Sequence, residues 1–526
     1  MESRLLSGRP LVVIVFALLL SIVLIALDQT IVATALPVIV SDFNALQDVT
    51  WVTAGYVLTI VAFTPMYGQA LTVFPTKWVY IIAIVLFEMG SLFCGTAPMV
   101  HLLIFGRIFA GIGAAGICVS VLTLIAESTE IRYRAIVFAA IGALFNLSNI
   151  VGPMLGGAFT THLSWRWCFY INLPLGALAC LVIILKLPLH KPLTGAAERA
   201  TVKSFLDMDW IGCSLSIAAM VVLLLSLSRG SSNGWNSPVV ITLLCVCILL
   251  LTCLFLWERH QGDRGILPLR VIACRSKIGA CIVVFFTMFN TLAFIFYIPL
   301  LYQAVYGHSP FHSAIDMLPF VLSSVIATAS SALILSRTGH YWSILVCGPM
   351  FCCVSGGLFF TVTENTSSTK LIIYQILYGI GTGTTMQNTF VALQALSKPE
   401  TMSISNAIVT VMQMLGGFIG VTIAGVVFDA QLRQNLAVYA PNVDPGPITA
   451  SVAAIYSEVT STARPSVIHA YVKSLDCVFL TASPAGFLTV LGAALIRNVK
   501  LGLKGIPRDQ EPRQSTSLPR GDSEKN

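Results

Sequence analysis

Long apolar runs recur from one end of the chain to the other, and they constrain its fold more than any other feature. A run of 18 or more apolar residues predicts a membrane-crossing helix, because about 20 helical residues span a hydrocarbon core of about 30 Å. Fourteen such runs are present, near residues 10–35, 49–71, 78–97, 101–124, 135–160, 167–186, 209–228, 238–257, 278–303, 313–336, 341–362, 370–396, 402–428 and 475–496. The chain is 56% hydrophobic and 10% charged, so it has too little polar surface to cover a water-soluble globule. The sequence therefore predicts an all-α, polytopic membrane protein with 14 transmembrane helices, and it excludes a soluble enzyme, a secreted disulfide scaffold and a DNA-binding domain.

The lysines and arginines are distributed unevenly over the predicted loops. If both termini lie in the cytoplasm, most of the 30 fall on the cytoplasmic side, as in the stretches 187–208 and 258–277. Cytoplasmic loops of membrane proteins carry such an excess of positive charge, so both termini are predicted to be cytoplasmic. The same rule explains the basic charge of the chain, and nucleic acid is not expected as a partner. The polar stretch 429–474 is then expected on the outer side. The tail 497–526 is rich in charge, proline and serine, which predicts a disordered cytoplasmic segment.

A weak internal repeat divides the chain. Glycine pairs of the fourth and fifth runs recur in the twelfth and thirteenth, as Gly-Ile-Gly at 111–113 and 379–381 and as Gly-Gly at 156–157 and 416–417. We expect two six-helix bundles with a linker that carries the extra helices 7 and 8, and the predicted bounds are 1–186, 278–496 and, for the linker, 187–277. Parallel repeats of this kind are typical of secondary transporters, which bind their substrate near the bilayer midplane between the two halves.

A glycine motif and the cysteines each have a simple structural interpretation. Gly111, Gly113 and Gly116 match the G-x-G-x-x-G pattern of dinucleotide sites, but no strand precedes them and they lie within an apolar helix. Small residues on one helix face favour close helix packing in lipid, which is the interpretation we prefer. The 14 cysteines lie mostly in apolar runs without a C-x-x-C pair, so neither a metal site nor a cofactor is expected.

Two charged residues lie inside predicted spans, where each costs about 2.5–3.5 kcal/mol at a helix centre and therefore indicates function. Asp28 lies about 27 Å along the first helix, and Arg107 about 9 Å below the outer end of the fourth. Both are expected in the outer third of the membrane. They could face one water-filled cavity or pair directly, and a purely structural ion pair is the alternative to a proton-coupling role.

Further polar residues in the spans leave two interpretations open. Glu88 lies near the middle of the third run, where it is either a second proton site or a hydrogen-bonding group between helices. Uncharged amides in later spans either contact a substrate or hold helices together. The amides that we assign to the substrate pathway are Gln303, Gln387, Asn388 and Gln413.

The fifth run contains the most specific motif, Gly152-Pro153-Met154-Leu155-Gly156-Gly157, in which proline removes a helix hydrogen bond and the glycines permit a bend. Four further segments are LDQTIVATALP (27–37), GRIFAGIGAAG (106–116), WRWCFYINLPLG (165–176) and PLLYQAVYGHSPFHSAIDMLP (299–319). Through this motif and these four segments, the chain resembles the major facilitator superfamily. The similarity is greatest to its fourteen-spanner drug:proton antiporters, and among these to fungal toxin efflux pumps. It implies that Asp28 and Arg107 couple protons, and that Gly152, Pro153, Gly156 and Gly157 form the antiporter motif that favours export.

The loop between the second and third runs departs from this family. Its usual pattern is Gly-x-x-x-Asp-Arg-x-Gly-Arg-Lys. Gly68 and Lys77 are present here, but the acid, the bases and the glycine between them are replaced by Thr72, Val73, Pro75 and Thr76. The usual gating salt bridge of that loop therefore cannot form, and we interpret the change as a mark of the toxin-pump subgroup.

Together these features predict a secondary transporter, not an enzyme, that exports a small amphipathic metabolite in exchange for protons. A proton-coupled importer of a nutrient or siderophore is the alternative. The expected partners are the small-molecule substrate, protons and the lipid bilayer, and the protein is expected to work as a monomer. We expect the plasma membrane as its location, with a vacuolar or vesicle membrane as the alternative, and glycosylation at Asn365 in an outer loop.

Overall fold

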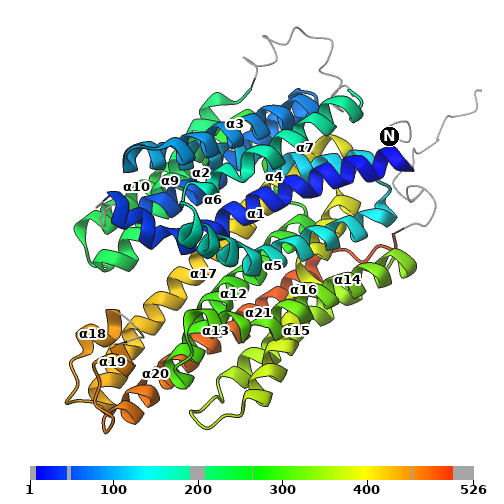
Figure 1. Ribbon diagram of the computed structural model, residues 1–526. Coiled ribbons are helices and arrows are strands. Elements are labelled where there is room, and N and C mark those ends of the chain that lie inside the picture. The colour runs from blue at the N-terminus through cyan, green and yellow to red at the C-terminus, as the bar shows by residue number, and fades with distance from the viewer. Residues whose placement is uncertain are drawn as a thin grey trace, which may run out of the picture.

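The structure is a computed structural model that describes residues 8–43, 49–189, 208–262, 265–450, 452 and 454–501. Within these ranges the regular elements are all helices (Figure 1). The helices before the predicted linker are α1 (Arg9–Phe43), α2 (Val49–Val73), α3 (Thr76–Thr96), α4 (Val100–Ser128), α5 (Ile131–His162), α6 (Trp167–Tyr170) and α7 (Asn172–Lys186).

The central and C-terminal parts continue the same pattern. The two long helices of the predicted linker are α9 (Trp210–Asn233) and α10 (Pro238–Gln261). The helices that follow are α11 (Leu269–Ile272), α12 (Arg275–Tyr306), α13 (Pro310–Ile315), α14 (Leu318–Thr338), α15 (Trp342–Phe359), α16 (Ser368–Leu396), the 3-10 helix η5 (Pro399–Thr401), α17 (Met402–Tyr439), α18 (Pro445–Ala450), α19 (Ala454–Ser457), α20 (Arg464–Leu480) and α21 (Ala482–Leu495).

Thirteen helical stretches of the described residues are long and apolar enough to cross a membrane. They coincide with thirteen of the predicted runs. The run at 370–396 forms α16, a helix of 29 residues that is not among the thirteen, and its sequence is interrupted by threonine, glutamine and glycine. The prediction of an all-helical membrane protein is confirmed, whereas the count of fourteen spans stays a prediction. The predicted disordered tail lies outside the described residues from 502 onward.

The polar stretch 429–474 contains the end of α17, the short helices α18 and α19, and the start of α20. α17 continues through Asp429 to Tyr439, and its 38 residues measure about 57 Å, far more than a bilayer core. α18 and α19 follow, and α20 begins at Arg464 with a proline in its first turn. Hydropathy marks where a helix enters water and not where it ends. The segment after Asp429 is polar but has no proline before Pro441, so the helix continues beyond the apolar part.

The long helices contact one another mainly within two groups. In the first, α4 packs against α2 and α3, and α1 packs against α5 and α7; in the second, α17 packs against α12 and α20, and α16 against α14 and α15. Figure 1 shows the groups as an upper and a lower layer. The pair α9–α10 lies beside both groups, because Met220 and Leu224 of α9 are buried with Val61 of α2 and Val411 of α17.

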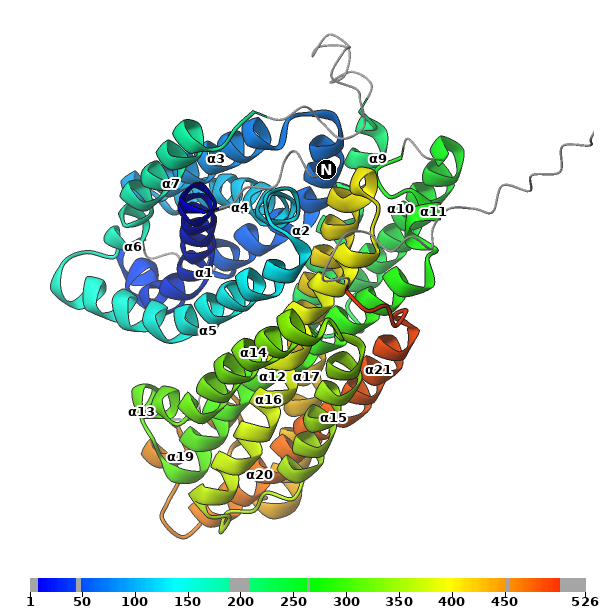
Figure 2. The ribbon, with the colours of Figure 1, turned by 90° about the vertical axis from the view of Figure 1, so that its right-hand side faces the viewer.

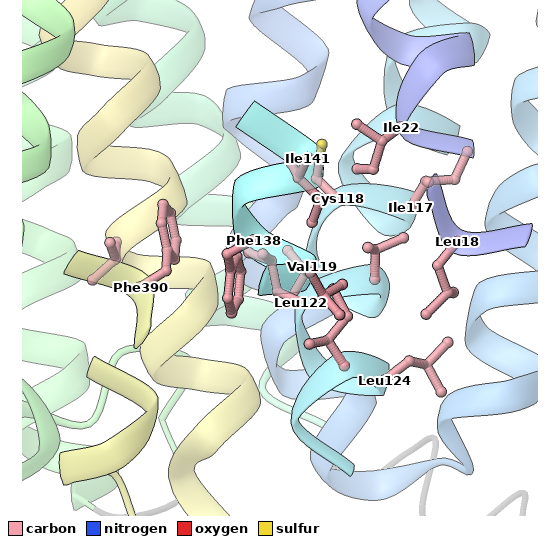
Figure 3. Packing of buried hydrophobic residues seen from close by; sticks show 14 of the residues in the cluster. Leu18, Ile22, Ile117, Cys118, Val119, Leu122, Leu124, Phe138, Ile141 and Phe390 are labelled. Carbon is pink, nitrogen blue, oxygen red and sulfur yellow. The ribbon is translucent and has the colours of Figure 1, made fainter. Parts of the chain in front are cut away.

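The two groups meet along α5 and α14 and along α2 and α17 (Figure 2). Phe138 of α5 stacks on Phe390 of α16 with ring centroids 6.0 Å apart (Figure 3). Nearby, Gln394 Nε2 of α16 donates a hydrogen bond to the Leu122 carbonyl oxygen of α4 at 3.0 Å. These residues lie toward the helix ends that the charge distribution predicts to be cytoplasmic.

Glycines set the spacing of the helices in both groups. A side chain at Gly111 would collide with Thr59 of α2, and one at Gly113 with the backbone of Phe87 in α3. Gly379 and Gly381 of α16 have the same relation to α14 and α15. The G-x-G-x-x-G segment thus lies at helix–helix contacts, as its position in an apolar helix predicts.

Candidate functional site

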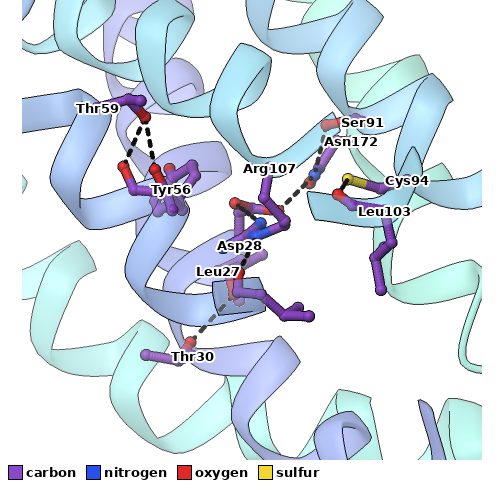
Figure 4. A network of polar contacts seen from close by, with 12 residues as sticks. Leu27, Asp28, Thr30, Tyr56, Thr59, Ser91, Cys94, Leu103, Arg107 and Asn172 are labelled. Carbon is purple, nitrogen blue, oxygen red and sulfur yellow. Dashed lines mark hydrogen bonds and ion pairs between the residues drawn. The ribbon is translucent and has the colours of Figure 1, made fainter. Parts of the chain in front are cut away.

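The two charges predicted to meet in the membrane form a direct ion pair between α1 and α4. Arg107 Nη1 lies 2.6 Å from Asp28 Oδ2, and the side chains are 2% and 0% exposed. Figure 4 shows Arg107 beside Asp28. Arg107 also donates from Nε to the Val52 carbonyl oxygen of α2 at 3.0 Å. Of the two arrangements that the sequence allowed, direct pairing is the one observed.

Aromatic rings and an amide complete the surroundings of the pair. The Arg107 guanidinium carbon lies 4.1 Å from the ring centroid of Tyr56 and 5.9 Å from that of Phe169. Asn172 Nδ2, in the first turn of α7, donates to Asp28 Oδ1 at 3.3 Å. Both carboxylate oxygens therefore accept a hydrogen bond. This compensates part of the cost of removing the charge from water.

Local sequence explains how these groups come together. Gly106, next to Arg107, allows α3 to approach at Cys94, and Gly111 allows α2 to approach at Tyr56 and Thr59. These glycines therefore allow α2 and α3 to pack closely against α4 near Arg107. Sequence reasoning missed Tyr56 and Asn172, although an asparagine inside an apolar run was a signal for the second.

Glu88 lies apart from the ion pair, in the seam between α3 and α7. Its side chain occupies the notch left by Gly176, where a Cβ atom would collide with the carboxyl group. Within the described ranges, neither carboxyl oxygen has a hydrogen-bond partner. One turn further along α3, Ser91 Oγ accepts a hydrogen bond from Asn172 Nδ2 at 3.1 Å. Glu88 is thus a neighbour of the Asp28 network without a hydrogen bond to it.

The helix-5 motif packs α5 against α1. A Cβ atom at Gly152 would collide with Thr30, and one at Gly156 with Thr34 and Ile31, whereas Gly157 has open space around it. Thr30 Oγ1 donates to the Ser148 carbonyl oxygen at 3.0 Å, one turn before Gly152 in the helix that contains Pro153. The motif therefore joins α5 to the helix that carries Asp28.

The four amides assigned to the substrate pathway fall into two kinds. Gln303 donates to Ser313 Oγ at 3.0 Å, and Asn388 donates to Ser331 Oγ at 2.9 Å, so both join helices within the second group. Gln387 lies against Gly142 of α5, at the contact between the groups. Gln387 and Gln413 are half-buried, and neither hydrogen-bonds within the described part of the chain.

The altered loop between α2 and α3 is held by hydrogen bonds to neighbouring helices. Lys77 Nζ donates to the carbonyl oxygens of Ile184 at 2.8 Å and Leu187 at 2.7 Å, at the C-terminal end of α7. Thr76 Oγ1 donates to Glu127 Oε1 of α4 at 3.1 Å. The lysine satisfies free carbonyl groups and complements the helix dipole there.

Many packed apolar helices with a buried ion pair between two of them define a polytopic membrane protein. Comparison with known proteins identifies the family. The model of the Major Facilitator Superfamily matches residues 18–421, and the chain belongs to this superfamily. It is therefore a transporter of small molecules and not an enzyme.

Relatives with similar sequences are named as fungal efflux proteins. The chain is 38% identical to the "MFS-type efflux pump MFS1" of Trichophyton rubrum, over 84% of this chain and 82% of the relative. It is 33% identical to the "Efflux pump aflT" of Aspergillus parasiticus, over 94% and 97%. Among solved structures, the human organic anion transporter MFSD10 matches with a TM-score of 0.61 at 15% identity, over 93% of this chain and 100% of that one. The resemblance found in the sequence is confirmed.

Proposed function

We propose that this protein exports a small amphipathic metabolite or toxin across the membrane in exchange for protons. The buried Asp28–Arg107 pair is the observation that carries the proposal. A buried ion pair is a poor means of stabilising a fold, so its presence between α1 and α4 favours a functional role. When Asp28 takes up a proton, its attraction to Arg107 weakens, and the contact between the two helices changes with the protonation state.

The direction of transport is inferred from the relatives and the helix-5 motif. Relatives at 33–38% identity are named efflux pumps, and one is named "Aspyridones efflux protein". Gly152, Pro153 and Gly156 at the α1–α5 contact match the motif of exporters. The fold alone favours neither direction, because a proton:xylose symporter matches with a TM-score of 0.58 at 12% identity. Proton-coupled import of a nutrient or siderophore is therefore the alternative.

We assign substrate contacts first to Gln387 and Gln413. Each is a half-buried carboxamide in a long helix, with no hydrogen bond among the described residues. Gln394 Nε2 of α16 lies 3.5 Å from Asn406 Oδ1 of α17. Gln387 is seven residues before Gln394, and Gln413 is seven residues after Asn406. Each glutamine therefore lies about two helical turns from that contact, on the same face of its helix. Gln303 and Asn388 contact a substrate only if their present hydrogen bonds break.

The proposed membrane arrangement follows from the helices and the charges. Fourteen spans, including α16, form two six-helix bundles, 1–186 and 278–496, with α9 and α10 as the extra pair. Both termini lie in the cytoplasm, and the monomer resides in the plasma membrane, with a vacuolar or vesicle membrane as the alternative. Exposed Asn365, in the loop before α16, is then on the outer side and open to glycosylation.

Alternating access requires the contacts between the two groups to separate. Phe138–Phe390 and Gln394–Leu122 close the predicted cytoplasmic side in this structure. A substrate arriving from the cytoplasm reaches Gln387 and Gln413 only when these contacts open, as rocking of one half against the other would allow.

Two experiments test this function in sequence. Deletion of the gene, followed by comparison of intracellular and secreted metabolites, identifies the substrate as the compound that accumulates inside the cells. That compound is then used in sealed vesicles containing the purified protein, with and without an imposed pH gradient. Accumulation that depends on the gradient supports antiport, whereas uptake into intact cells that the deletion abolishes would support the importer.

A further inference from the structure

The two oxygens of Asp28 have chemically different partners. Oδ2 faces Arg107 Nη1 at 2.6 Å, and Oδ1 faces Asn172 Nδ2 at 3.3 Å. The same Asn172 nitrogen donates to Ser91 Oγ at 3.1 Å. Asn172 is 1% exposed, and its own oxygen, Oδ1, is buried without a hydrogen-bond partner among the residues that the structure describes.

These partners determine where a proton can bind on Asp28. A guanidinium only donates hydrogen bonds, so a proton on Oδ2 would point at another donor. The proton must therefore bind to Oδ1, on the side of Asn172. A carboxylic acid donates from its O–H, and the Asn172 amide nitrogen now facing Oδ1 cannot accept that hydrogen bond.

We propose that Asn172 is a positioning residue that serves both protonation states of Asp28 by turning its carboxamide through a half-turn. The half-turn brings Asn172 Oδ1, which has no partner in the described part of the chain, to the place of Nδ2, where it accepts from protonated Asp28. Ser91 then donates its hydroxyl hydrogen to the same oxygen instead of accepting from nitrogen. This inference rests on the proposed role of Asp28 as the proton carrier.

The charges balance in this step. One O–H bond forms at Asp28 Oδ1 as one O–H bond of a hydronium ion breaks and leaves neutral water, the carboxylate loses its charge, and Arg107 keeps its own. Asn172 and Ser91 change only the direction of their hydrogen bonds. A neutral amide and a hydroxyl suit this role because each can donate and accept without ionising.

Other titratable groups surround Asp28 and could contribute to its titration. Those in electrostatic range are Tyr56 of α2, Glu88 and Cys94 of α3, Arg107 of α4 and Cys168 of α6. Of the hydrogen bonds that Arg107 and Asn172 donate to Asp28, the one from Asn172 comes from an uncharged group. Asn172 is therefore the group whose replacement separates hydrogen bonding from charge.

Infrared difference spectroscopy of the full-length protein in lipid nanodiscs tests the inference without a substrate. The carboxylic acid C=O band that Asp28→Asn removes reports protonation of Asp28 as the pH of the buffer is varied. With Asn172→Leu, we expect the midpoint of this band to move upward by about one pH unit. The ionised form loses a charge-assisted hydrogen bond, which is stronger than the bond that the neutral form loses. A carboxamide band that appears with Asp28 protonation should also disappear.

Matched variants separate this role from packing. Asn290→Leu removes an equally buried amide, one that donates to the Ala482 carbonyl oxygen at 3.3 Å, and should leave the midpoint unchanged. Asn172→Gln keeps a carboxamide, so the midpoint of the Asp28 band should lie close to that of the unmodified protein. Ser91→Ala keeps the contact between Asn172 and Asp28 and should weaken the carboxamide band that appears when Asp28 is protonated. This variant remains informative if Asn172→Leu does not fold.

The outcomes distinguish this inference from the proposed function. An unchanged midpoint in Asn172→Leu, with the Asp28 band present, overturns the role of Asn172 and leaves Asp28 as the proton carrier. If Asp28→Asn removes no band at any pH, Asp28 does not exchange protons, and both proposals fail.

Discussion

At the residue scale, the ion pair between Asp28 and Arg107 has a cost that can be measured. Removing one partner leaves the other charge buried and alone, which destabilises proteins by about 3–5 kcal/mol. Arg107→Leu should therefore lower the thermal unfolding temperature in detergent strongly. The double variant Asp28→Asn/Arg107→Leu should be more stable than Arg107→Leu alone, because it contains no unpaired charge. Equal stability of the two variants would show that Asp28 is not a charged partner of Arg107.

Glu88 gives a second test at this scale. Its carboxyl group has no hydrogen-bond partner among the described residues. Glu88→Gln keeps the shape in the notch at Gly176, so we expect proton-driven transport in vesicles to stay within about a factor of three of the unmodified protein, less than 1 kcal/mol in the barrier. Loss of gradient-driven accumulation, with substrate exchange intact, would instead identify Glu88 as a proton carrier.

Sequence alone located the two charged residues and allowed their pairing, but it did not locate the uncharged groups around them. Asp28 and Arg107 were predictable because a charge in an apolar run is rare and costly. Asn172 was not, because an amide is tolerated in many helices and only the packing of α7 shows that it reaches Asp28. The same limit explains why the contacts of Gln303 and Asn388 could not be predicted, because their hydrogen bonds to Ser313 and Ser331 depend on neighbouring helices.

At the element scale, neighbouring glycines of α5 provide a matched pair. A Cβ atom at Gly156 would lie 2.5 Å from the Ile31 carbonyl oxygen of α1, whereas one at Gly157 would meet nothing within 4 Å. Gly156→Ala should force the helices apart and cost about 1–3 kcal/mol, with reduced transport. Gly157→Ala should be tolerated in both unfolding temperature and transport rate. Equal effects of the two would argue against close packing of α1 and α5 as the role of the motif.

Helix ends were the least predictable elements. The apolar runs located the helices, because lipid requires an unbroken apolar surface of nearly fixed length. The continuation of α17 to Tyr439 could not be predicted in this way, since a helix outside the membrane has a polar surface. Absence of proline or glycine between Asp429 and Tyr439 was the signal that hydropathy did not use.

At the scale of the whole molecule, the account requires the cytoplasmic contacts to open during transport. Gly68 of α2 faces the Cβ atom of Ala407 in α17, close enough for a disulfide after small adjustments. Oxidation of Gly68→Cys/Ala407→Cys should stop transport, and a reductant should restore it. The single variants control for the native cysteines. Undiminished transport by the cross-linked protein would contradict opening at this contact.

The central claim is that Asp28 couples the pH gradient to substrate movement. The most direct measurement is substrate flux in vesicles containing Asp28→Asn, with and without an imposed pH gradient. The substitution keeps the size of the side chain and removes its charge and titration. The account predicts that accumulation driven by the gradient disappears while exchange of labelled for unlabelled substrate continues. Accumulation against the substrate gradient by Asp28→Asn would contradict the account.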